Sequence, residues 1–247
     1  MSNKFIILLG PSCIGKSQLM RALKTFYPAL GNPFRQLVLY NDRPIRPGEQ
    51  EGVDYFFRPR GEIEALGHSP GHVMAEVRGD LQVLELAQIQ RILDDGNFPF
   101  FEGNPYIPEK LRDVGALDQL PALSVFLSPV SREEILFLKS QSSVDLETVV
   151  TEIQRRKLLY RAGKMKTALG PKELANMEQR CASTIHEMRN AWKLDYVIPM
   201  HDGECNDNWD VLGFPIGAAR RALEAFAALL QGNETPDAEK WEENLVP

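Results

Sequence analysis

The chain has 247 residues, of which 43% are hydrophobic and 25% charged, a composition typical of a globular protein with a sizeable core. Its 28 basic and 34 acidic side chains give a formal net charge of −6, which argues against a dedicated nucleic-acid binder, because such domains are usually basic. The three cysteines, Cys13, Cys181 and Cys205, are too few and too scattered for a disulfide framework or a CxxC metal site. A reduced, intracellular setting is the simplest interpretation.

The first apolar run lies at residues 5–9 and reads FIILL, five residues that end at a glycine. A signal peptide needs a longer apolar region with a cleavage site of small residues, and a membrane-spanning helix needs about 20 apolar residues. Because the sequence contains neither, we expect a soluble, cytoplasmic protein without a membrane partner. A short, continuous apolar run of this kind is typical of a buried parallel strand.

Short apolar runs between turn residues predict further strands at residues 36–40, 98–101, 123–127 and 196–200. Helical apolar spacing predicts helices at residues 17–26, 84–94, 131–139, 146–161, 171–192 and 217–230. This alternation predicts an α/β fold with a parallel sheet covered by helices on both faces. Residues 232–247 are polar, acidic and proline-containing, and we expect this tail to extend or fray.

The strongest motif follows the first predicted strand: residues 10–17 read GPSCIGKS and match the phosphate-binding pattern G-x-x-x-x-G-K-[ST]. Glycines let the backbone curl so that successive N–H groups point at phosphate oxygens, and the N-terminus of the following helix adds positive charge. Lys16 is expected to bridge the β- and γ-phosphates, and the Ser17 hydroxyl to hold Mg²⁺. The predicted site for the phosphates of ATP therefore comprises Gly10, Ser12, Cys13, Ile14, Gly15, Lys16, Ser17 and Gln18.

A second candidate anion site lies within residues 41–57. Arg43 and Arg46 are three residues apart and precede a turn and a Gly-x-Asp-Tyr-x-Phe element that contains Tyr55. The forked donors of arginine match phosphate oxygens, and a tyrosine hydroxyl adds one more donor. Taken alone, such a stretch is usually a solvated loop, but the phosphate loop upstream favours a site.

Together the two elements resemble the guanylate kinase family of nucleoside monophosphate kinases, which pairs G-P-S-x-x-G-K-S with T-T-R-x-x-R-x-G-E-x-x-G-x-D-Y-x-F. The positions that match the second pattern are Arg43, Arg46, Gly48, Glu49, Gly52, Asp54, Tyr55 and Phe57. The resemblance implies a P-loop kinase fold in which ATP, with Mg²⁺, phosphorylates GMP. It also implies a domain over residues 1–231, with an acceptor-binding insert at about 36–97, a lid at about 139–193, and a polar tail at 232–247.

The resemblance also assigns roles to single residues. Arg43, Arg46 and Tyr55 are expected to bind the phosphate of the acceptor nucleotide. Glu102 ends the apolar run 98–101, where this superfamily places a carboxylate that helps to hold Mg²⁺ through water, although an ordinary loop acid explains it equally well. His201 and Asp202 follow the last predicted strand, and their position favours a loop that backs the adenine over a metal or catalytic cluster.

Positive charge gathers in the predicted lid of this otherwise acidic chain, at Arg155, Arg156, Lys157, Arg161, Lys164, Lys166 and Lys172. Phosphoryl transfer depends mainly on positioning and charge neutralisation, so a closing lid that carries Arg155 and Arg156 would stabilise the transferred group. A solvated basic helix face is the alternative. The apolar stripe of residues 171–192 is expected to be core or subunit contact, which leaves homo-oligomerisation open.

Two departures from the family pattern leave the acceptor base open. The hydroxyl residues before the first arginine are replaced by Asn41 and Asp42, and residues 73–82 lack the tyrosine and aligned carboxylate used for guanine, with Glu76 or Asp80 as substitutes. Phosphorylation of another nucleotide or a ribose bisphosphate is therefore an alternative. A second alternative is a non-catalytic guanylate-kinase-like binding module, although such modules typically have a degraded phosphate loop and this one is intact.

Overall fold

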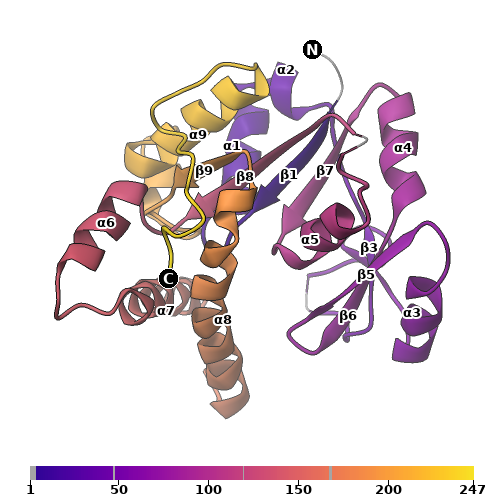
Figure 1. The fold of residues 1–247 in the computed structure, drawn as a ribbon, viewed down its shortest axis with the longest axis horizontal. Helices are drawn as coiled ribbons and strands as arrows, with labels where there is room; N and C mark the ends of the chain where they lie inside the picture. Colours follow the sequence, from indigo (N-terminus) through magenta and orange to yellow (C-terminus); the bar gives the residue numbers. More distant parts are fainter. Residues whose placement is uncertain (1–3, 47, 119, 167–168) are drawn as a thin grey trace. The chain divides into compact units, whose positions relative to one another are not determined.

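The computed structural model describes residues 4–46, 48–118, 120–166 and 169–247 (Figure 1). A five-stranded sheet has the strand order β2-β7-β1-β8-β9, and its pairs β2–β7 and β8–β9 are parallel. Its strands are β1 (Phe5–Leu9), β2 (Phe34–Gln36), β7 (Phe98–Gly103), β8 (Ala122–Ser128) and β9 (Tyr196–Pro199). All five side chains of β1 are fully buried, as its uninterrupted apolar sequence predicts.

Helices flank this sheet, so the predicted α/β fold is confirmed. The helices found close to their predicted places are α1 (Lys16–Phe26), α4 (Leu86–Asp94), α6 (Arg132–Ser140), α7 (Leu146–Lys164), α8 (Pro171–Arg189) and α9 (Gly217–Leu230). The sequence did not indicate α2 (Pro28–Gly31), α3 (Arg60–Gly67), α5 (Tyr106–Asp113) or the 3-10 helix η2 (Asp207–Trp209). The end of the helix predicted at residues 171–192 is a separate 3-10 helix, η1 (Ala191–Lys193). Within the described residues, no helix is both long enough and apolar enough to span a membrane.

The apolar run at residues 36–40 is two strands, so its prediction as one strand is wrong. The chain leaves the large sheet after β2, where Leu37 N–H still donates to Phe100 O (2.8 Å) and Val38 N–H donates to the Gln88 side chain (2.7 Å). It then enters a second sheet as β3 (Leu39–Asn41). An apolar run cannot reveal this change, because both sheets bury the same residue types.

The second sheet has the order β4-β3-β6-β5, with β4 (Tyr55–Phe57), β5 (His72–Val77) and β6 (Asp80–Glu85). Strand β3 pairs in parallel with β4 and antiparallel with β6, and β5 and β6 form a hairpin. Its two-residue turn, Arg78-Gly79, has positive φ at both positions, as the right-handed twist of hairpin strands favours. One face packs on α3 through Ile63, Leu81 and Val83, which leaves the other face for Asn41, Tyr55 and Gln82.

The chain divides into two compact units. The first, Met1–Ile7 with Pro33–Leu123, contains the second sheet. The other, Leu8–Asn32 with Ser124–Pro247, contains the phosphate-loop sequence, α6 to α9 and the tail. Within it, α9 packs against both α1 and β9. Each unit is described by itself below.

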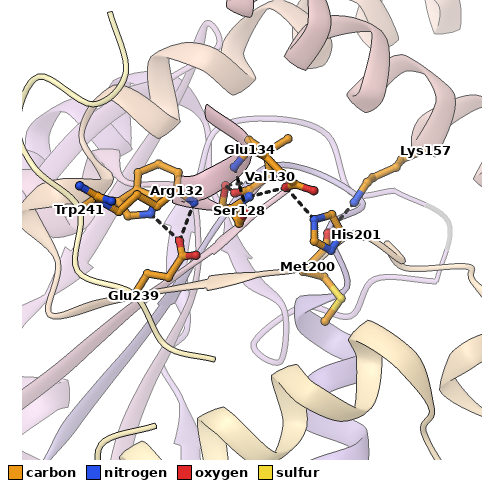
Figure 2. A network of polar contacts seen from close by, with 10 residues as sticks. Ser128, Val130, Arg132, Glu134, Lys157, Met200, His201, Glu239 and Trp241 are labelled. Atoms are coloured by element: carbon orange, nitrogen blue, oxygen red, sulfur yellow. Dashed lines mark hydrogen bonds and ion pairs between the residues drawn. The ribbon is translucent and has the colours of Figure 1, made fainter. Parts of the chain in front are cut away.

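The C-terminal tail extends, as one of the two predicted alternatives had it, but it is anchored and does not fray at Glu239. Glu239 and Val197 of β9 exchange two backbone hydrogen bonds (2.7 and 2.8 Å), which adds a short bridge beside β9. Figure 2 shows the Glu239 carboxylate accepting hydrogen bonds from the Arg132 backbone N–H and the Trp241 indole. Trp241 and Leu245 are buried. The sequence prediction missed these apolar anchors because most residues of the tail are polar.

Candidate active site

The phosphate-loop sequence connects β1 to α1 through a backbone that needs glycine at two positions. Gly10 has φ +147°, and a Cβ there would lie 2.7 Å from Leu127 O of β8. Gly15 has φ +108°, and a Cβ there would lie 3.0 Å from the Trp209 ring. Any side chain at either position would collide with its neighbour, so the glycine pattern is required by packing as well as by backbone conformation.

Lys16 is the first residue of α1, and its side chain folds back along the loop. Its Nζ donates to Gly10 O (2.7 Å) and Pro11 O (3.0 Å), which places the ammonium on the loop itself. Ser17, the next residue, is exposed in the first turn of α1, where the helix N-terminus favours an anion.

The outer side of the loop is in contact with two other segments. Ser12 O accepts a hydrogen bond from the Gln154 side chain of α7, and Cys13 O accepts one from Glu204 N–H (2.9 Å). Cys13 has φ +64° and its thiol donates to Lys157 O (3.5 Å). Burial raises the pKa of Cys13 to about 11, so the thiol stays protonated and fills space rather than reacting.

The acceptor-type element lies in the first unit, on the face of the second sheet opposite α3. In the parallel β3–β4 register, Leu39 is opposite Tyr55 and Asn41 is opposite Phe57, so the two aromatic rings lie on one face. The Arg43 guanidinium is 5.1 Å from the Tyr55 ring centre and 5.4 Å from that of Phe57. This arrangement is a cation–π contact on two rings.

Glu49 holds Arg43 in this place. Arg43 Nη1 and Nη2 donate to the two Glu49 carboxylate oxygens (2.7 and 2.6 Å), and Arg46 N–H donates to the same carboxylate (2.9 Å). Burial opposes the charge of Arg43, but Glu49 outweighs it and raises the Arg43 pKa. The Arg43 hydrogen bonds lower the pKa of Glu49, so both groups are charged at neutral pH.

A family model described as guanylate kinase matches residues 2–169 of this chain. The chain belongs to the guanylate kinase family. It is 30% identical over 159 residues to a guanylate kinase of Streptococcus pneumoniae, covering 62% of this chain and 71% of that protein. It is 28% identical over 214 residues to one of Alkalilimnicola ehrlichii, covering 85% of this chain and 84% of that protein.

The fold agrees with this assignment. A crystal structure of guanylate kinase from Anaplasma phagocytophilum matches with a TM-score of 0.55 at 17% identity, covering 94% of this chain and 86% of that one. At this identity the likeness concerns the fold alone. Membership of the family makes the chain a phosphotransferase of the nucleoside monophosphate kinase type.

The two carboxylates that the sequence suggested for the acceptor base, Glu76 and Asp80, lie on opposite faces of the second sheet. Asp80, two residues before Gln82 on β6, lies on the Tyr55 face, where its charge helps to raise the Arg43 pKa. Glu76 pairs with Leu81, whose side chain packs toward α3, so Glu76 lies on the α3 face of the sheet, away from Tyr55. On the Tyr55 face, Asn41 is directly opposite Gln82, and the two side chains are 0% and 8% exposed. The Asn41 side-chain oxygen accepts from Arg43 N–H (3.1 Å), and its Nδ2 has no partner within the described residues.

Helix α7 presents a different face to the phosphate loop from the one the sequence suggested. Arg155 pairs with Glu178 (2.7 Å) and with Glu152, and Arg156 is exposed. Gln154 and Lys157 instead contact the loop. Sequence reasoning missed Gln154 because it searched for charge, although residues 154, 157 and 161 share one helix face.

Lys157 and the loop after β9 are linked, as Figure 2 shows. Lys157 Nζ donates to Met200 O (2.7 Å), and burial lowers the pKa of Lys157 to about 8. His201 bonds to the Glu134 carboxylate (2.9 Å). Asp202, the other candidate adenine-loop residue, accepts from Asn208 Nδ2 (3.0 Å) and Ala219 N–H (2.9 Å), which stabilises the N-terminus of α9.

The candidate magnesium ligands belong to different units. Ser17 lies in the first turn of α1 in one unit, and Glu102 is half-buried near the end of β7 in the other. Within the described residues, no three His, Cys, Asp or Glu side chains gather as a metal cluster. Mg²⁺ in phosphoryl-transfer sites usually takes one or two protein oxygens together with substrate phosphates and water, and the Ser17 hydroxyl fits such a site.

Proposed function

We propose that this protein transfers the γ-phosphoryl group of ATP to a nucleoside monophosphate, with GMP as the first acceptor to test. The observation that carries the proposal is the phosphate loop of residues 10–17, with its left-handed backbone at Cys13 and Gly15 and Lys16 lying on it. Family membership supports the same reaction, since the relatives named above are guanylate kinases.

On the donor side, the ATP phosphates bind the backbone N–H groups of the loop and the N-terminus of α1. Lys16 exchanges its two loop carbonyls for phosphate oxygens, which neutralises charge as the γ-phosphoryl group leaves. Mg²⁺ supplies further charge neutralisation when it is bound with ATP, and Ser17 and Glu102 are the residues proposed to hold it.

On the acceptor side, Arg43, Arg46 and Tyr55 bind the phosphate of the acceptor. The Arg43 hydrogen bonds to Glu49 and Pro44 use both Nη1 donors and one Nη2 donor, and the guanidinium also interacts with the Tyr55 hydroxyl. The acceptor phosphate takes the guanidinium donors that remain. An oxygen of the acceptor phosphate attacks the γ-phosphorus directly, so the reaction requires no protein nucleophile.

The lid cations proposed from the sequence keep their role as a separate hypothesis. Arg155 holds two carboxylates, so delivering its charge to the transferred group requires it to release Glu178. Arg156 is exposed, so its guanidinium can reach an anion from the surface of α7. Substitution of each arginine by alanine, with kcat as the readout, separates the two contributions.

A second candidate is a kinase of the same chemistry with a different acceptor base, and the Asn41–Gln82 pair favours it. A carboxylate accepts both adjacent N–H donors of guanine, whereas an amide offers one donor and one acceptor, which suits adenine equally well. The burial and register of these two amides on the Tyr55 face support this reading of the acceptor pocket.

A coupled assay of ADP release with a panel of nucleoside monophosphates and sugar phosphates tests both candidates. We expect turnover with at least one nucleoside monophosphate, and loss of about 10²- to 10³-fold in kcat for Lys16→Ala. Lys24→Ala, an exposed position of α1, is the matched control. Absence of turnover with every acceptor, together with unchanged ATP binding in Lys16→Ala, would contradict the proposal and favour the binding module.

A further inference from the structure

The outer side of the phosphate loop carries two successive carbonyl groups that are held by residues distant in sequence. Ser12 O accepts from the Gln154 side chain, 142 residues away, and Cys13 O accepts from Glu204 N–H. Lys16 engages the two preceding carbonyls, those of Gly10 and Pro11. Four consecutive carbonyls of the loop are therefore turned toward partners.

These contacts determine where the loop's N–H groups point. A trans peptide unit is planar, so its N–H points opposite to its C=O. Holding Ser12 O against α7 turns the Cys13 N–H away from α7, and holding Cys13 O against Glu204 does the same for the Ile14 N–H. Successive N–H groups turned to one side form the anion-binding concavity of a phosphate loop.

Gln154 is suited to this task by its burial and by the chemistry of its amide. Its side chain is 0% exposed, and its Oε1 has no partner among the residues the structure describes. Because Ser12 O is an acceptor, only the NH₂ group of Gln154 can face it, which fixes the orientation of the amide. Among the described residues, the buried Gln154 side chain therefore directs its hydrogen bonding to Ser12 O.

Helix α7 is itself fixed along the face that carries Gln154. Lys157 donates to Met200 O (2.7 Å), Arg161 pairs with Glu204 (3.2 Å), and Lys164 pairs with Asp207 (2.8 Å). The helix and the loop after β9 therefore form one support, from which both Gln154 and Glu204 N–H reach the phosphate loop.

We propose that Gln154 is a positioning residue for the donor phosphates, which holds the Ser12–Cys13 peptide in the anion-binding orientation before the donor arrives. The inference rests on the proposed function only for its kinetic part, because donor binding can be measured without turnover. Gln154 acts through the loop, so its loss weakens the binding of the donor and leaves that of the acceptor unchanged.

The test compares Gln154→Met with Gln179→Met, which makes the same change at an exposed position of α8. Calorimetry with Mg²⁺-ATP gives Kd, and steady-state assays give KM for ATP and for the acceptor. Losing the bond and leaving a buried carbonyl unpaired is expected to raise both ATP constants about tenfold in Gln154→Met. The acceptor KM and all constants of Gln179→Met are expected to match wild type.

Gln154→Glu provides a second variant, because it keeps the shape of the side chain but places a carboxylate oxygen against Ser12 O. We expect an ATP Kd at least as high as that of Gln154→Met. ATP constants within twofold of wild type in both variants, or equal losses for donor and acceptor, would overturn the inference. Wild-type protein that binds ATP but turns over no acceptor contradicts the proposed function alone; failure to bind ATP contradicts both.

Discussion

The two regions proposed to bind phosphate are stabilised in different ways. The phosphate loop is held by Gln154, 142 residues from its partner Ser12, and by Glu204 N–H on Cys13 O. The acceptor element is held from within, since Arg43 and Glu49 are six residues apart and the Arg46 N–H reaches Glu49 over three. One site depends on tertiary packing, whereas the other is a local ion-paired loop.

This difference predicts that a substitution in one region changes the binding of that region's ligand and leaves the binding of the other ligand unchanged. A change at Arg43 or Glu49 alters an ion pair that lies within residues 41–57, so we expect the donor site to keep its support. A change in α7 or in the loop after β9 alters the phosphate loop and leaves the ion pair of Arg43 intact. Kinetic constants for donor and acceptor should therefore respond separately.

The largest separate response is expected for Arg43→Ala. This change removes the cation that lies over Tyr55 and Phe57, and with it a charge-assisted phosphate contact. We expect kcat/KM for the acceptor to fall about 100-fold, while Kd for Mg²⁺-ATP stays within twofold of wild type. Steady-state kinetics and calorimetry measure the two quantities.

The control for that experiment is Arg91→Ala, which breaks an exposed ion pair with Glu85 in the same unit. Exposed pairs contribute little to stability, so this variant should behave as wild type. An ATP Kd that rises as much as the acceptor constant in Arg43→Ala would show that the two regions are coupled and would break the comparison.

A smaller acceptor effect is expected for Glu49→Gln. The amide retains one acceptor for the Arg43 guanidinium but faces it with an NH₂ group where a carboxylate oxygen stood. Because Arg43 still lies on the two rings, we expect the acceptor KM to rise about tenfold. An acceptor KM equal to that of wild type would mean that the rings alone position Arg43, and double-mutant analysis with Arg43→Ala measures the coupling.

The clustering of Arg43, Arg46 and Tyr55 could be predicted from sequence because its contacts are local, whereas their role as an acceptor site stays a prediction. The spacing of Arg43, Arg46 and Tyr55 already placed them in one turn-containing segment, and the structure adds Glu49 as their organiser. The support of the phosphate loop could not be predicted in this way. Gln154 has no charge and belongs to no motif, and its partner Ser12 lies 142 residues away in the sequence.

The same physical distinction applies to the fold. Continuous apolar runs predicted β1 and β8 close to their observed positions, because strands buried on both faces are uniformly apolar. The small sheet was missed, since its strands β3 and β4 have only three residues each and their pairing depends on neighbours far along the chain. Propensity over three residues carries little information against such tertiary pairing.

Gly203→Ala probes the long-range support without altering a polar group. Gly203 has φ +72°, and a Cβ there would lie 3.2 Å from Cys13 O and 3.3 Å from Lys157 Cδ. Gly213 has φ +71° and open space around it, so Gly213→Ala carries the same backbone strain without the contacts. We expect Gly203→Ala to lower the unfolding free energy by about 1 kcal/mol more than Gly213→Ala does. We also expect the KM for ATP to rise severalfold in Gly203→Ala alone.

Urea unfolding and ATP kinetics of the two alanine variants provide the measurement. Equal losses of stability and equal ATP constants would mean that the contact of Gly203 with Cys13 does not support the loop. Gly203, Cys13 and Lys157 all lie in the unit that contains the phosphate loop. An effect of Gly203→Ala on the acceptor KM alone would therefore contradict the comparison more severely.

The smallest effect is a pH dependence that only the donor support should show. Burial lowers the pKa of Lys157 to about 8, with Cys13, Asp202 and Glu134 as the charged or titratable groups around it. The unfolded chain holds this proton up to about pH 10.4, so between these values the unfolded state binds more protons and stability rises with pH. Below pH 8 both states are protonated and the cost of burying the charge is present in full.

Lys157→Met removes this titration, and Lys24→Met, at an exposed position of α1, is its control. Relative to Lys157→Met, wild-type protein should gain up to about 1 kcal/mol of unfolding free energy between pH 7 and 8.5, while Lys24→Met should parallel wild type. Urea unfolding at the two pH values measures the gain. A constant difference between wild type and Lys157→Met would mean that the Lys157 ammonium is solvated, and that α7 is held to Met200 less tightly than the 2.7 Å contact indicates.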